Sequence, residues 1–230
     1  MAYTRKYSWV RLFCSAQIGD EHYGFSEVPR PTLFPEPTMS DTANSKDTLD
    51  GYITDMLALE EHIAKAINSQ LADFSKEHPD FAGILSTIAA TTARHIGALE
   101  ALKTSRHIDA GSIVADAVKR AGSVVAGLGA AAIDFVRTEK LPKNLRDDYT
   151  AYSLASIGYQ MLMTTAISLN DDDVAAHART HFTDYAKIVA DLSQAIPGAV
   201  IDELRKQGLA VNPDAAEMVR QDIEKIWESV

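Results

Sequence analysis

The stretch DMLALEEHIAKAI, residues 55–67, decides the fold of this chain. Its apolar residues recur at intervals of three and four, which predicts a helix with one apolar stripe made of Met56, Leu59, Ile63 and Ile67. Glu60 falls inside that stripe. A buried carboxylate is costly unless another group compensates its charge. The sequence must therefore supply a partner for Glu60 from a neighbouring helix.

A helical pattern extends over nearly all of the chain after residue 47, and no strand pattern accompanies it. We expect four long helices at about 48–75, 79–106, 145–169 and 172–196, and two shorter ones at 198–207 and 213–229. Pro79, the turn LPKN at 141–144, the acidic turn at 170–173 and Pro197 separate them. Because short connections join antiparallel neighbours, the predicted fold class is all-α, an up-and-down four-helix bundle.

Two segments lie outside this pattern. Residues 1–47 contain four prolines and no periodic apolar face, which predicts a flexible extension. Residues 110–138 are rich in small residues that let helices approach closely, although Gly122, Gly127 and Gly129 can equally bend such a helix. We therefore expect an extension at 1–47, a bundle at 48–197 and a C-terminal helical extension at 198–230. The polar stretch from Met39 is typical of a protein N-terminus, so translation starting there is a further hypothesis.

Composition excludes several classes of protein. The net charge of −10 argues against a nucleic-acid partner. The single Cys14 cannot form an internal disulfide, which suits a reducing compartment. No apolar run is long enough for a transmembrane helix, and Arg11 interrupts the apolar patch near the N-terminus. We expect a cytoplasmic protein, and no nucleotide-binding or nucleophile motif is present.

The segment 79–106 supplies the candidate partner for Glu60, because His95 lies on its apolar face. Carboxylates and imidazoles on neighbouring helices are the ligands of di-metal bundles, in which two helices each give a Glu and two give Glu-x-x-His. Here the second helix has Thr92 in place of that Glu, and the segment 145–169 turns tyrosines inward instead of a glutamate. His181 and Asp184 complete the candidate metal ligands Glu60, His95, His181 and Asp184. The alternative, without metal, is a direct pair of Glu60 with His95 or with a tyrosine hydroxyl.

Two stretches also resemble a known family. LDGYITDMLALEEHIAKAI (49–67) and TTARHIGALEAL (91–102) resemble the first two helices of the ferritin-like stress proteins of the YciE/YciF type. The resemblance implies a ferritin-like bundle, a ligand glutamate at Glu60, a ligand histidine at His95 and a following glutamate at Glu100. In the second half, only Asp184 stands where that family places acidic residues.

These observations favour a ferritin-like bundle protein, stress-associated and dimeric, with a binding or structural role and a degenerate or single-ion metal site. Iron or manganese is the expected metal, and no metal at all is the alternative. A second hypothesis is a di-metal carboxylate oxidoreductase or ferroxidase. A third is a scaffold or membrane-surface protein that uses the segment 110–138.

Overall fold

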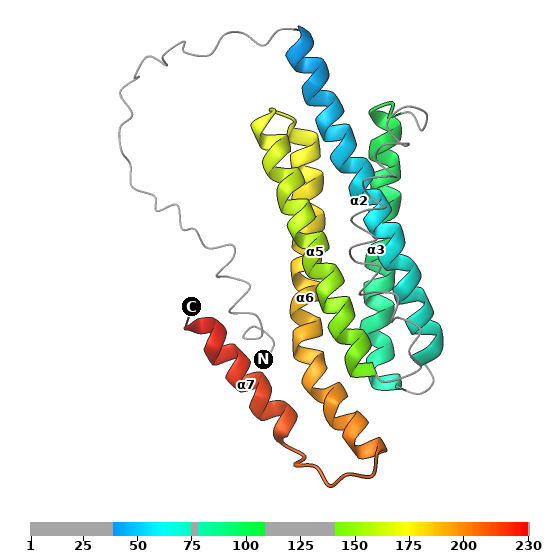
Figure 1. Cartoon of the computed structure of the whole chain (residues 1–230), viewed down its shortest axis with the longest axis vertical. Helices are drawn as coiled ribbons and strands as arrows, with labels where there is room; N and C mark the ends of the chain where they lie inside the picture. Colours follow the sequence, from blue (N-terminus) through cyan, green and yellow to red (C-terminus); the bar gives the residue numbers. More distant parts are fainter. Residues whose placement is uncertain (1–38, 75–77, 109–140, 230) are drawn as a thin grey trace, which may run out of the picture.

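The computed structural model describes residues 39–74, 78–108 and 141–229. Within these ranges the chain forms helices and no strand, which confirms the all-α prediction. The helices are α2 (Met39–Phe74), α3 (Pro79–Ser105), α5 (Leu141–Ser168), α6 (Asp172–Lys206) and α7 (Ala215–Glu228). The four long helices run side by side, and α7 lies beside the C-terminal part of α6 (Figure 1). None of the described helices combines the length and the apolar character needed to cross a lipid bilayer.

The apolar stripe of α2 faces the bundle interior as predicted, since Met56, Leu59, Ile63 and Ile67 are all buried. The most extensive helix contact joins α5 and α6, α2 packs on both α3 and α5, and α3 and α6 share the least extensive contact of these pairs. Gly158 permits the close approach of α5 to α2, because a Cβ at this position would lie 2.6 Å from the Met56 sulfur. Helix contact is therefore most extensive along α5 and least extensive between α3 and α6.

Two helix starts differ from the prediction, those of α2 and α5. α2 begins at Met39 and not at Thr48, so residues 39–47 belong to a helix, while residues 1–38 and 109–140 lie outside the described residues. α5 begins at Leu141, because Pro142 in a first helical turn sacrifices no backbone hydrogen bond. The predicted turn LPKN is thus part of the helix.

α6 was predicted to end at Pro197, followed by a separate helix at 198–207, and both expectations are wrong. The helix continues through Pro197 to Lys206. Ala195 and Ala199 on either side are buried, so the packing of this segment outweighs the hydrogen bond that proline removes. The Arg220 side chain of α7 also donates to the Gln194 carbonyl at 2.9 Å, three residues before the proline.

An ionic network joins three parts of the bundle at one end. Arg106, after α3, donates to Asp50 on α2 at 2.7 Å and to Asp171 at 2.6 Å. Asp50 is buried and also accepts from Lys46 one helical turn earlier. Asp171 caps α6 by accepting from the Val174 amide at 3.1 Å, which confirms the predicted capping role of the acidic turn.

Candidate metal centre

Glu60 and His95 meet in the interior of the bundle, as predicted from their apolar stripes. Glu60 lies on α2 and His95 on α3, and both side chains are 0% exposed. The His95 Nδ1 atom lies 3.3 Å from Glu60 Oε1. His181 of α6 is also buried beside this pair. Three helices thus bring one carboxylate and two imidazoles together.

Two tyrosines complete the surroundings of Glu60. The Tyr159 hydroxyl on α5 donates to Glu60 Oε1 at 2.6 Å, and the Tyr185 hydroxyl on α6 donates to Glu60 Oε2. Burial, together with the Glu60 charge, raises the pKa of both phenols, so both remain protonated donors. Hydrogen bonds to both oxygens explain how the fold tolerates a carboxylate in its core. The sequence predicted inward tyrosines and a tyrosine hydroxyl as one alternative partner of Glu60, and two such hydroxyls contact it.

His95 lies between two carboxylates. Its Nδ1 faces Glu60, and its Nε2 lies 3.1 Å from Asp184 Oδ2. A neutral imidazole carries only one N–H, so one of its nitrogens would then point a lone pair at a carboxylate oxygen. A proton shared by Glu60 and His95, or a cation between them, removes this repulsion. The geometry therefore suits a proton or a cation at this point.

His181 is held as a neutral imidazole. Its ring stacks on His95 with a centroid separation of 3.6 Å and an interplanar angle of 5°. Burial, with the charges of His95, His177 and Arg94, lowers the pKa of His181 to about 2. Its Nδ1 lies 2.8 Å from the Tyr159 oxygen. Because the Tyr159 proton is directed to Glu60, His181 Nδ1–H donates to Tyr159 and the Nε2 lone pair is left available.

Glu60, His95 and His181 form a group that can hold a metal ion. Each offers one ligand atom, and these atoms all lie within 4.8 Å of one another. Ligand atoms around a tetrahedral ion with bonds of about 2.0 Å are separated by roughly 3.3 Å. The side chains must therefore draw together around an ion, and one of the two stacked rings must tilt. Two imidazoles and one carboxylate suit Zn²⁺ and Fe²⁺.

Asp184 takes a different place from the one predicted. It lies beside the group of three and not within it, accepting from His95 Nε2 and from Arg94 Nη2 at 2.8 Å. Burial of Asp184 acts to raise its pKa, but Arg94 and His95 outweigh this effect and the net pKa is lowered. A carboxylate that accepts from the outer nitrogen of a metal-binding histidine fixes its tautomer and orientation. Asp184 is therefore suited to orient His95.

Two further residues qualify the sequence prediction. Glu100, which the resemblance matches to the glutamate that follows the histidine, is exposed and lies outside the group. His177 is half-buried next to His181, with ring centroids 4.1 Å apart, and received no role from sequence. The available signal was the spacing of His177 and His181, because positions i and i+4 share one face of a helix.

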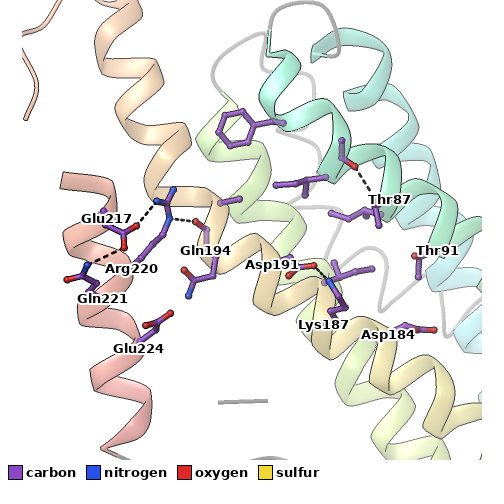
Figure 2. A pocket seen from close by; sticks show the side chains of 16 residues that line it. Thr87, Thr91, Asp184, Lys187, Asp191, Gln194, Glu217, Arg220, Gln221 and Glu224 are labelled. Atoms are coloured by element: carbon purple, nitrogen blue, oxygen red, sulfur yellow. Dashed lines mark hydrogen bonds and ion pairs between the residues drawn. The ribbon is translucent and has the colours of Figure 1, made fainter. Parts of the chain in front are cut away.

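A groove of about 700 Å³ borders the centre between α3, α6 and α7. Asp184 lies at one end of this groove, and the α7 residues Glu217, Arg220 and Glu224 lie at the other (Figure 2). Its lining holds four carboxylates and two basic side chains, so the groove has an acidic balance. Asp184 is 32% exposed and connects the groove to His95 of the buried metal-binding group.

Comparisons with known proteins add no functional assignment. No family model matches the chain, and no curated protein or solved structure matches it. Among residues 39–74, 78–108 and 141–229, no second group of three His, Cys, Asp or Glu ligands is found. Function must be argued from the geometry of Glu60, His95 and His181.

Proposed function

We propose that this protein binds one divalent transition-metal ion between Glu60, His95 and His181 in the interior of its helical bundle. The observation that carries the proposal is the position of His95 between two carboxylates. With Nε2–H donated to Asp184, the Nδ1 lone pair faces Glu60 at 3.3 Å, a separation that suits two ligand atoms of one ion. A cation bound by both groups turns this repulsion into coordination.

The charges near the group suit a single ion. Glu60 and Asp184 are the carboxylates that contact His95, and Arg94 already neutralises part of the Asp184 charge. A second cation close by would need further carboxylates, but α5 places Tyr159 there and the Tyr159 phenol stays protonated. The di-metal oxidoreductase hypothesis is therefore the weaker of the two.

The donor set also favours some metals over others. Imidazole nitrogen suits zinc and iron, whereas manganese prefers oxygen ligands, so we propose Fe²⁺ or Zn²⁺ ahead of Mn²⁺. With three protein ligands, an ion bound at this centre would keep one coordination position open and would supply a Lewis acid. Asp184 would orient His95, and the tyrosines would hold protons beside Glu60. The ferritin-like relationship, the stress-associated role and the dimer remain predictions from sequence.

Metal titration of untagged, chelator-treated protein tests the proposal. We expect one Zn²⁺ per chain by isothermal titration calorimetry. Glu60→Gln and His181→Gln should each weaken binding by more than the roughly 10- to 100-fold that loss of an orienting neighbour costs. His62→Gln, a half-buried histidine on the same helix as Glu60, is the matched control and should bind like the wild type.

Circular dichroism of each variant verifies that the bundle remains folded. Absence of Zn²⁺ and Fe²⁺ binding by the wild type would refute the proposal in favour of a doubly protonated His95. Equal binding by Glu60→Gln would also refute it. Two tightly bound ions per chain would favour the di-metal hypothesis.

A further inference from the structure

Three imidazole rings form a row from the surface of the bundle to its centre. His177 is half-buried, His181 is 2% exposed and His95 is 0% exposed. The ring centroids of His177 and His181 lie 4.1 Å apart, and those of His181 and His95 lie 3.6 Å apart. The row lies between α3 and α6, the pair of packed long helices with the least extensive contact. The row thus leads from a partly exposed imidazole to a fully buried one.

His177 has a nitrogen without an assigned role. Its Nε2 is buried, and no hydrogen-bond partner for it occurs among the described residues. A buried nitrogen of this kind is destabilising unless it serves another purpose. His177 and His181 also stand one helical turn apart on α6, the spacing at which two imidazoles can bind one ion.

We propose that His177 is the entry ligand for the metal centre: an arriving ion binds first to His177 and His181 and then passes to Glu60 and His95. This inference rests on the proposed function. The outer position consists of His177 and His181, and the inner position consists of Glu60, His95 and His181. Because His181 belongs to both, the ion keeps one imidazole ligand throughout the transfer. The inner position includes the Glu60 carboxylate and is therefore the more stable of the two. Because the χ2 torsion of histidine is broad, the His177 ring can turn its nitrogens without movement of α6.

An entry ligand has a kinetic signature that differs from that of a permanent ligand. His177 contacts the ion only during passage, so its removal raises the barrier between the free and the bound state equally in both directions. Association and dissociation rates should then fall by the same factor, and the dissociation constant should not change. A permanent ligand would instead mainly increase the dissociation rate and weaken equilibrium binding.

The experiment measures Zn²⁺ uptake and release by stopped flow with a chromophoric chelator, using the full chain. His177→Ala should slow both association and dissociation about tenfold, the change that corresponds to about 1.4 kcal/mol of barrier. His62→Ala is the matched control and should keep both wild-type rates. His177→Cys, which restores a zinc ligand of different shape, should recover most of the rate.

An unchanged association rate in His177→Ala would overturn the inference while leaving the proposed function intact. An increased dissociation constant with an unchanged association rate would overturn it as well, because His177 would then be a permanent ligand. Failure of the wild type to bind Zn²⁺ overturns both proposals and is seen before any variant is examined. Folding of His177→Ala is verified by circular dichroism, and His177→Gln replaces it where the alanine variant does not fold.

Discussion

Asp148 on α5 provides a test of the bundle's electrostatics outside the candidate metal centre. The carboxyl is 2% exposed, and its Oδ1 accepts from Gln70 Nε2 on α2 at 2.8 Å. Asp148 Oδ2 and Gln70 Oε1 have no hydrogen-bond partner among the described residues. Burial raises the Asp148 pKa from 3.8 to about 7, against the opposing hydrogen bond from Gln70 and with a further contribution from Asp147. The carboxyl is therefore neutral at mildly acidic pH.

The sign of the pH dependence follows from this raised pKa. Between pH 3.8 and about 7 the folded state binds more protons than the unfolded state, so stability falls as pH rises through this range. The difference of about three pH units corresponds to about 4 kcal/mol in all. Roughly 2–3 kcal/mol of it falls between pH 5 and pH 8. Asp148→Asn keeps the shape of the neutral acid and should remove this loss.

Urea unfolding at pH 5 and pH 8, analysed by linear extrapolation, measures the effect. The wild type should lose roughly 2–3 kcal/mol more than Asp148→Asn over this interval, and the variant should be the more stable protein at pH 8. The comparison between variant and wild type cancels the contribution of every other titratable group. Asp73→Asn, an exposed position one turn beyond Gln70, should follow the wild type. Equal pH dependence of wild type and Asp148→Asn would refute the argument.

Three further predictions concern packing and the termini of the bundle. Arg106→Gln leaves the buried Asp50 without its main partner and should lower the free energy of unfolding by about 3 kcal/mol; an unchanged urea midpoint would contradict this. Gly158→Ala should lower the free energy of unfolding by about 1–3 kcal/mol, because the new methyl would meet the Met56 sulfur at 2.6 Å. Gly97→Ala is the control: it has open space around the new methyl and should raise the free energy of unfolding by about 0.5–1 kcal/mol. A variant that begins at Met39 retains every described helix and should melt within a few degrees of the full chain, and a large drop would show that residues 1–38 support the bundle.

The sequence predicted the first half of the centre better than the second. Glu60 and His95 each interrupt a clear apolar stripe, and consecutive antiparallel helices bring such stripes together, so their meeting could be anticipated. The places of His181 and Asp184 depend on how α6 is rotated against α3, which no periodicity specifies. On α6, His181 takes a ligand position, whereas Asp184, one helical turn further on, takes the position that orients His95. The continuation of α6 through Pro197 was missed for a similar reason, since tertiary packing outweighed a local signal.

The two proposals depend on an asymmetry between the helices. α6 places His177, His181, Asp184 and Tyr185 in successive turns toward α3 and α2, whereas α5 contributes the protonated phenol of Tyr159 and no charge. Negative charge at the centre therefore comes from Glu60 in the interior and Asp184 at its edge. That arrangement holds too little negative charge for two cations, and outside the group of three it adds one further imidazole, that of His177 on α6. The lack of charged ligands on α5 argues against a second ion, and the histidines of α6 indicate the direction from which a single ion would enter.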